Sequence, residues 1–277
     1  MDFSAFFEYL SMMVTYDFAK KALIVGSLTA LCSALLGVSL VLKRYSMIGD
    51  GLSHVGFGAL CVASVLNLAP LKVAVPVVIV AAFFLLKLSE NSKIKGDAAI
   101  AMISGTAVAA GLVITSFVDG LSSDVSGYMF GSILSIDDSD VPLSVILSVV
   151  VILLYVLFYN RIFSVTFDES FSKAAGIKVD LYNALIALLT AVTIVIGMKL
   201  MGTVLISGLI IFPPLSAMRV CKSFKSVTAV SAVISVICFV VGIFLSFVFD
   251  TPAGATVVLV NAVTFAVFFA AGKLKKA

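Results

Sequence analysis

Apolar runs of about 20 residues follow one another along almost the whole chain, separated by short polar segments. A helix of about 20 apolar residues crosses the ~30 Å hydrocarbon core of a bilayer. The alternating segments of about ten residues that a transmembrane β-barrel needs are not found. The pattern therefore predicts an all-α, polytopic helical membrane protein with nine spans. These cover residues 22–42, 48–66, 71–88, 98–117, 141–159, 181–198, 203–218, 227–249 and 255–271.

The sixth and seventh predicted spans are short and closely joined, so eight spans are the alternative. Residues 1–16 are amphipathic and are predicted to lie at the membrane interface, within a single membrane domain that covers residues 1–277. Two connections are longer than turns. The first contains a short apolar stretch, 127–136, that suits a half-helix, and the second, 160–180, contains a predicted short helix ended by Gly176.

Composition agrees with a membrane protein. Hydrophobic residues make up 62% of the chain and charged residues 12%, against about 25% charged in soluble domains. The mean hydropathy is +1.24. The four cysteines are scattered, without a C-x-x-C motif, and are expected to act as small buried apolar residues. No cleavable signal peptide is expected from the acidic first 16 residues.

The positions of Lys and Arg predict the orientation, because cytoplasmic loops are rich in both. With alternating loops, all but four of the 18 Lys and Arg lie on one side, which is therefore predicted to be cytoplasmic. The exceptions are Lys20, Lys21, Lys72 and Lys199. Lys20 and Lys21 count against this arrangement unless they reach the interface from the end of the span. The amino terminus is then outside and the carboxy terminus is cytoplasmic.

The only histidine, His54, lies in the second predicted span, four residues after Asp50. A helix places positions i and i+4 on one face, and ionisable side chains inside a membrane usually have a function. Imidazole and carboxylate together provide half of a divalent-metal site. A two-fold homodimer would supply two of each, which is enough for one ion.

A structural interpretation of the same residues remains open. Asp50 would cap the helix and His54 would bond a neighbouring carbonyl. The small residues Gly49, Gly51 and Ser53 would line a narrow path or a dimer seam, or simply allow packing. The Pro213–Pro214 pair must interrupt the hydrogen-bond ladder of the seventh span, either as a broken transporter helix or as a packing kink.

Missing motifs exclude several classes of function. The chain has no G-x-x-x-x-G-K-[ST] phosphate loop and no H-E-x-x-H, so neither nucleotide hydrolysis nor metalloprotease chemistry is expected of it. Basic residues do not cluster with aromatic ones as a nucleic-acid surface would require. The chain is therefore expected to be a transport subunit and not an enzyme.

Five blocks of sequence resemble the membrane permeases of zinc, manganese and iron ABC importers. In the family's order they are RYSMIGDGLSHVGFGAL (44–60), SGYMFGSIL (126–134), FDESFSKAAGI (167–177), MGTVLISGLIIFPPLSAMR (201–219) and FDTPAGATVVL (249–259). The blocks span most of the chain, and the first and last are the most specific. The segment after the histidine, Val55–Gly56–Phe57, departs from the small or aliphatic run that most members have.

This resemblance implies a homodimer with a fold like that of type II ABC importers, in a bacterial cytoplasmic (inner) membrane. Its partners would be two cytoplasmic ATPase subunits and an extracytoplasmic metal-binding protein. Asp50 and His54 fall on the family's metal-coordinating positions. A cytoplasmic coupling helix that docks into the ATPase is implied at the segment that holds Glu169, Phe171, Ala174, Ala175 and Gly176.

The closing block resembles zinc permeases more than manganese ones, so transported Zn²⁺, or else Mn²⁺ or Fe²⁺, is expected to bind transiently, with no resident cofactor. Two other functions stay open on the residues alone. One is a metal carrier driven by protons through Asp50 and His54, and the other is a membrane scaffold or pH sensor that moves no metal.

Overall fold

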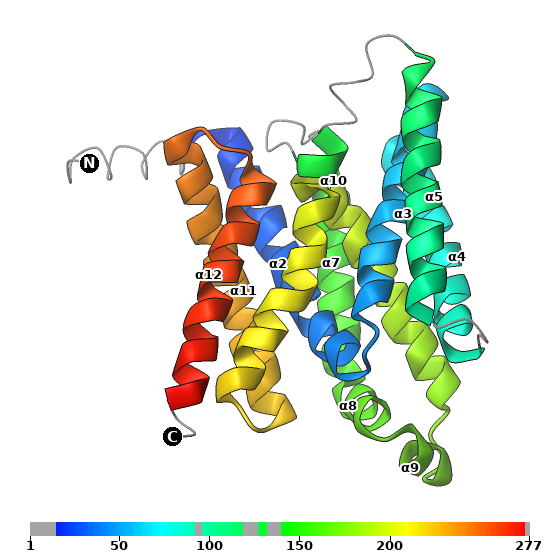
Figure 1. Cartoon of the computed structure of the whole chain (residues 1–277), viewed down its shortest axis with the longest axis vertical. Helices are drawn as coiled ribbons and strands as arrows, with labels where there is room; N and C mark the ends of the chain where they lie inside the picture. Colours follow the sequence, from blue (N-terminus) through cyan, green and yellow to red (C-terminus); the bar gives the residue numbers. More distant parts are fainter. Residues whose placement is uncertain (1–14, 92–95, 119–126, 132–139, 275–277) are drawn as a thin grey trace, which may run out of the picture.

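The computed structural model describes residues 15–91, 96–118, 127–131 and 140–274, and regular secondary structure in these residues is helical throughout. The helices run roughly along one direction and form a bundle (Figure 1). In chain order they are α2 (Asp17–Leu42), α3 (Ser46–Val65), α4 (Pro70–Asn91), α5 (Gly96–Ser116), α7 (Asp140–Leu157), α8 (Tyr159–Phe167), α9 (Glu169–Ala174), α10 (Val179–Val220), α11 (Phe224–Phe249) and α12 (Ala253–Leu274).

Nine stretches of the described chain are long and apolar enough to cross a membrane. They match the predicted spans to within a few residues, and α10 supplies two of them, Val179–Met198 and Met201–Val220. The nine-span prediction is therefore confirmed over its eight-span alternative. Lys20 lies in the first turn of α2, where its Nζ is 3.6 Å from Asp17 Oδ1.

The two halves of α10 are separated by Gly202, which has φ 79° and ψ 163°. Only glycine adopts this conformation readily. The site is also crowded, because a Cβ on Gly202 would lie 2.4 Å from the backbone nitrogen of Gly131 and 2.5 Å from the carbonyl oxygen of Met129. Gly202 thus allows the chain to turn back and to pack against residues 127–131.

The prolines of α10 do not break it. Pro213 and Pro214 are buried and the helix continues through them, so of the two alternatives the broken helix is wrong. The interruption of α10 lies at Gly202, between the predicted spans 181–198 and 203–218. Because Pro214 has no N–H, it cannot donate to the Ile210 carbonyl four residues earlier. Gly37 of α2 lies against this carbonyl, and a Cβ there would be 2.1 Å from the Ile210 oxygen.

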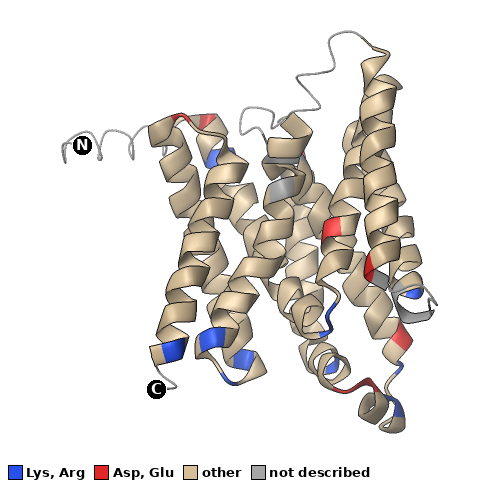
Figure 2. Ribbon diagram, viewed as in Figure 1, with Lys and Arg blue, Asp and Glu red and all other residues tan. Residues whose placement is uncertain are grey.

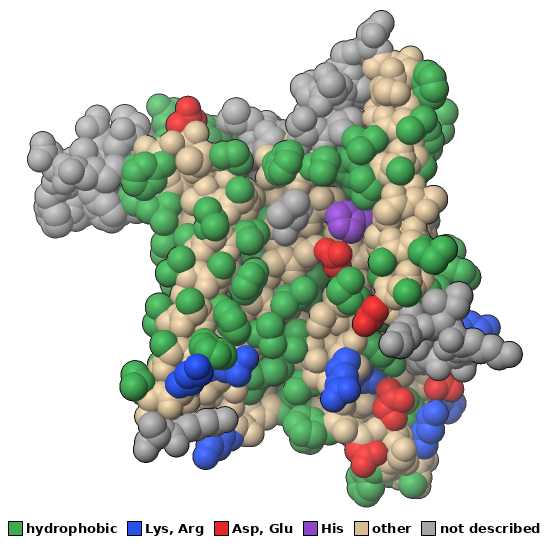
Figure 3. Space-filling view, viewed as in Figure 1, with side chains coloured by type: hydrophobic (Ala, Val, Ile, Leu, Met, Phe, Trp, Pro, Cys, Tyr) green, Lys and Arg blue, Asp and Glu red, His purple; other side chains and the backbone are tan. Residues whose placement is uncertain are grey.

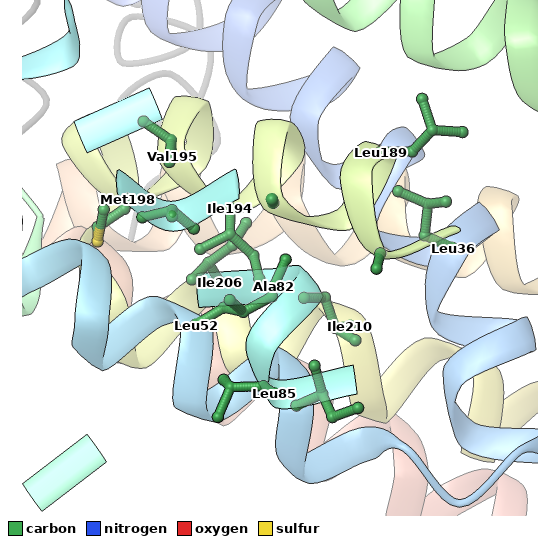
Figure 4. Packing of buried hydrophobic residues seen from close by; sticks show 14 of the residues in the cluster. Leu36, Leu52, Ala82, Leu85, Leu189, Ile194, Val195, Met198, Ile206 and Ile210 are labelled. Carbon is green, nitrogen blue, oxygen red and sulfur yellow. The ribbon is translucent and has the colours of Figure 1, made fainter. Parts of the chain in front are cut away.

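The core is formed mainly by α2, α3, α4 and α10. Leu36, Leu52, Leu85 and Ile194 are among its most fully buried side chains. Figure 4 shows Leu52 and Ile194 close together, and Leu36 beside Leu189. Helices α5, α7 and α12 lie at the periphery. Only 28%, 22% and 17% of the residues in their most apolar 18-residue stretches are buried. Their exposed apolar faces suit contact with lipid or with another protein.

Charge is distributed unevenly between the ends of the bundle. The described start of α2 and the end of α12 lie at opposite ends (Figure 1). Helices α8 and α9 lie at the same end as the C terminus, and most of the visible blue residues gather there (Figure 2). An odd number of spans accounts for the separation of the two ends.

Several predictions differ from the structure or fall outside it. The connection 160–180 is not one loop with one helix, because α8 precedes α9 and residues 179–180 already belong to α10. Helix α8 was missed because only one of its faces, with Ile162 and Val165, is buried and apolar. The interfacial segment 1–16 lies almost wholly outside the described residues, as does the second half of the expected half-helix 127–136, residues 132–136; residues 127–130 are helical.

Candidate functional site

Asp50 and His54 lie in the first half of α3 and point to the same side of it. The Nε2 atom of His54 is 3.7 Å from Oδ2 of Asp50, and the two side chains are 31% and 36% exposed. His54 is the ninth residue of this 20-residue helix, which places it near the middle of a membrane span. The i, i+4 spacing in the sequence therefore gives the geometry that was expected.

An open groove of about 500 Å³ lies between α3 and α5, and the pair faces it. Figure 3 shows the purple histidine at the molecular surface with a red acidic side chain beside it. The groove contains one carboxylate and no Lys or Arg, so its charge favours a cation. Its lining consists of Met47, Asp50, His54, Ala101, Ser104, Gly105, Val108, Ala109 and Leu112.

One copy of the chain cannot enclose a metal ion with these ligands. In the described residues no group of three or more His, Cys, Asp or Glu side chains is close enough to hold an ion. A desolvated dication needs about four protein ligands. The described residues therefore leave part of the coordination of such an ion to other groups.

The small residues beside the pair face the interior of the bundle and not the groove. A Cβ on Gly49 would lie 3.4 Å from Ile210, and one on Gly51 would lie 2.6 Å from Ile100. Ser53 is fully buried, donates to the Asp50 carbonyl at 2.7 Å and lies 3.3 Å from Ser207 Oγ of α10. These contacts hold the back of α3 against α5 and α10 and so fix the direction of the pair.

At the other candidate site, α9 projects from the end of the bundle (Figure 1). Asp168 caps it by accepting a hydrogen bond from the Phe171 backbone nitrogen at 2.9 Å. Gly176, with φ 79°, follows its last turn. Phe171 is 66% exposed, and Ala174, Ala175 and Gly176 are exposed as well. This end of the molecule therefore presents a small apolar knob, which is suited to a socket on another protein.

Glu169 differs from the other predicted residues of α9, because it points toward the bundle. Its Oε1 accepts from Lys43 Nζ at 2.5 Å and from Asn183 Nδ2 at 3.2 Å. Partial burial disfavours the charged carboxylate, but the hydrogen bond and the charge of Lys43 outweigh this and lower the pKa of Glu169. Lys43 and Asn183 were not identified from the sequence, since no local pattern links them to Glu169.

The sequence model of the ABC 3 transport family matches residues 15–272. A Thermotoga maritima protein named "Probable metal transport system membrane protein" is 31% identical over 91% of this chain and 89% of its own length. The manganese import system permease protein ScaB of Streptococcus gordonii is 28% identical, over 95% of this chain and 94% of its own.

A solved structure has the same fold. PsaBC from Streptococcus pneumoniae in complex with Fab aligns with a TM-score of 0.85 and 27% identity, over 95% of this chain and 94% of that chain. The family match covers nearly the whole chain, and the relatives named above are membrane proteins of metal transport. The chain is thus a multi-pass membrane protein that belongs to the ABC 3 transport family, which confirms the resemblance to metal ABC importer permeases.

Proposed function

We propose that this chain is the membrane permease of an ATP-driven importer of divalent transition-metal ions, in a bacterial cytoplasmic membrane. The observation that carries the proposal is the placement of Asp50 and His54 together in an open groove halfway along a membrane span. Membership in an ABC transport family supports ATP as the energy source over the proton-driven carrier and the pH sensor.

The transport site forms at the axis of a homodimer. A second copy that covers the groove between α3 and α5 contributes its own Asp50 and His54, so that two carboxylates and two imidazoles surround one dication. Two negative charges balance the ion, and the mixed oxygen and nitrogen donors suit first-row metals. The ion binds in transit, because an ion held too tightly would not leave.

The ATPase is a separate cytoplasmic subunit, one for each permease copy. It docks on the apolar knob of α9, and the α9 end of the bundle is therefore cytoplasmic, in agreement with the Lys and Arg distribution. An extracytoplasmic binding protein delivers the ion at the opposite end. The amino terminus is then outside and the carboxy terminus is inside.

The donor set accommodates both zinc and manganese. Imidazole favours zinc and carboxylate favours manganese. The closing sequence block favours zinc, whereas the name of ScaB refers to manganese. Competition between labelled zinc and unlabelled manganese, and the reverse, ranks the two ions. A preference for manganese would contradict the inference drawn from the closing block.

The proposal is tested in proteoliposomes that hold the permease, its ATPase and its binding protein. Uptake is measured with and without ATP for wild type, Asp50→Asn and His54→Gln. Asp97→Asn, which removes an exposed carboxylate from the first turn of α5, is the matched control. We expect both site variants to lose at least about tenfold in uptake, because each removes two of the four ligands, while the control retains it.

The stoichiometry of bound metal is a second test. The purified wild-type dimer should hold one ion per two chains, and neither site variant should hold it. Undiminished uptake by both variants in an assembled complex would make the pair structural and would overturn the proposed transport site. ATP-independent uptake driven by a proton gradient would favour the carrier instead.

A further inference from the structure

Lys43 lies where three helices meet at the α9 end of the bundle. It is the C-cap residue of α2, and its side chain is only 5% exposed. Its Nζ donates to Glu169 Oε1 at 2.5 Å and to Asn183 Oδ1 at 2.6 Å. Asn183 is fixed in turn, since its Nδ2 donates to the same Glu169 oxygen. These three residues, the Lys43 cluster, join the end of α2 to the starts of α9 and α10.

The chain leads directly from Lys43 into the helix that carries the metal pair. Only Arg44, with φ 61°, and Tyr45 separate Lys43 from α3. The Tyr45 backbone nitrogen donates to the Leu40 carbonyl at 2.8 Å, and the Ile48 nitrogen donates to the Tyr45 carbonyl at 2.9 Å. The Lys43 ammonium also lies 5.6 Å from the centre of the Tyr45 ring. A displacement of Lys43 therefore cannot be absorbed by a loose loop before α3.

Because the Lys43 ammonium is buried, its contact with α9 is hard to break. A charged group that is almost excluded from water is costly unless it stays paired and hydrogen-bonded. Glu169 supplies the countercharge from α9, the helix whose outer side carries the apolar knob. When α9 is displaced, Lys43 must follow it or lose its countercharge. An exposed ion pair would not impose this condition, because water could replace either partner.

We propose that Lys43 and Asn183 are positioning residues that transmit the displacement of α9 to the first turns of α3, and so to Asp50 and His54. This inference rests on the proposed function, because it requires a partner that moves α9. In this proposal Glu169 connects α9 to α3, the helix that carries Asp50 and His54, whereas Phe171 contacts the ATPase. Removing the link should therefore separate ATP hydrolysis from metal movement without releasing the ATPase.

The test measures metal ions imported per ATP hydrolysed, in the reconstituted complex. Glu169→Gln and Lys43→Met each remove one charge, and Lys43→Arg keeps a cation that Glu169 can bind. We expect the first two to lower the ratio of ions to ATP at least tenfold, with the ATPase still bound and hydrolysing. Lys43→Arg should retain most of the ratio. Lys87→Met, which removes an exposed cation from α4, is the matched control.

The double variant Lys43→Met/Glu169→Leu separates transmission from stability. Replacing a buried ion pair by apolar residues often leaves folding intact, since no charge stays unpaired. A purely structural pair therefore predicts that the double variant regains the wild-type ratio. Transmission through the charged link predicts that the double variant melts like wild type but remains uncoupled, and that its defect is no larger than that of either single variant.

A double variant with the wild-type ratio would overturn the inference, and so would single variants that merely melt at a lower temperature. In either case wild-type uptake and its dependence on Asp50 and His54 stay intact, and the proposed function stands. Absence of ATP-driven uptake by the wild-type complex would overturn the proposed function itself. The two failures are therefore distinguishable in one set of vesicles.

Discussion

At the level of single residues, the two partners of the Lys43–Glu169 ion pair differ in their exposure to solvent. Glu169 is 41% exposed, whereas Lys43 beside it is almost buried. The ammonium needs the carboxylate more than the carboxylate needs the ammonium, because water can solvate only one of them well. This asymmetry makes the ionisation of Glu169 a property on which the stability of the folded chain depends.

The stability of the chain should therefore depend on Glu169 in a pH-dependent way. Because the pKa of Glu169 is lower in the folded state than its ordinary value, the carboxylate's contribution to the stability of the folded chain is complete at neutral pH and is lost as the pH falls through the lowered pKa. Glu169→Gln should cost about 1–3 kcal/mol at pH 7, because it leaves the buried Lys43 ammonium without its countercharge, while solvent around the partly exposed carboxylate screens part of the lost attraction. Thermal melting of both forms between pH 7 and pH 3 should show the difference shrinking in acid.

The groups that face Glu169 are Lys43, Asn183 and, at longer range, Lys173. The comparison with Glu169→Gln removes the contributions of all other carboxylates, which titrate in both forms. A melting difference that stays constant or grows in acid would contradict the assignment of the lowered pKa to the Lys43 pair.

Acid should also weaken metal binding at the proposed transport site. A protonated imidazole cannot act as a ligand, and the homodimer would contain two. Zinc affinity of the purified dimer, measured at pH 8 and pH 6, should fall in wild type. His54→Gln should bind more weakly at pH 8 and should lose less between the two pH values. Equal acid sensitivity of the two forms would show that the histidine is not a ligand.

Among the helices, the break in α10 depends on one glycine. Gly202 combines a φ of 79° with backbone atoms of residues 129–131 inside the space of a Cβ. Gly202→Ala should therefore destabilise the chain by about 2–4 kcal/mol, from backbone strain together with overpacking. Melting in detergent would measure this. Gly105→Ala is the control, because nothing lies within 4 Å of that Cβ, and it should be neutral or slightly stabilising.

Helix α9 should bind the ATPase mainly through its exposed aromatic side chain. Exposed aromatic anchors often dominate an interface, so Phe171→Ala should weaken ATPase binding by about ten- to a hundredfold, or 1.4–2.8 kcal/mol. Phe249→Ala provides the control, because Phe249 is similarly exposed, at 65% against 66%, but ends α11. Equal losses from the two variants, measured by titration of the purified subunits, would argue against α9 as the docking helix.

At the scale of the whole molecule, the groove beside Asp50 and His54 is half of a site. Gly105 lines it and has open space around its Cβ, so Gly105→Phe should leave the stability of one chain within about 0.5 kcal/mol. In a dimer closed over this groove, the same ring should collide with the partner. We expect loss of the dimer by light scattering and at least a tenfold loss of uptake.

Ala110→Phe is the control, since Ala110 is also exposed on α5 but does not line the groove. A Gly105→Phe protein that is still dimeric and active would place the dimer interface elsewhere and would leave Asp50 and His54 without their proposed partners.

The sequence by itself determined the spans, because an apolar run in hydrocarbon must satisfy its backbone hydrogen bonds internally and therefore forms a helix. It also determined the shared face of Asp50 and His54 and the stop at Gly176, which depend only on helix periodicity and local conformation. These properties involve residues within a few positions of one another, so local patterns predict them.

The tertiary structure alone decided which long-range contacts form. Lys43 contacts Glu169 and Asn183, which are 126 and 140 positions away in the sequence. The periodicity of a single helix cannot predict contacts between residues so far apart. The close packing of Gly202 against residues 129–131, where a Cβ would lie 2.4 Å from the Gly131 nitrogen, is likewise a long-range contact, although the boundary between the two spans at this point was predicted from the sequence. Packing between distant helices, and not the propensity of any segment, fixed both features.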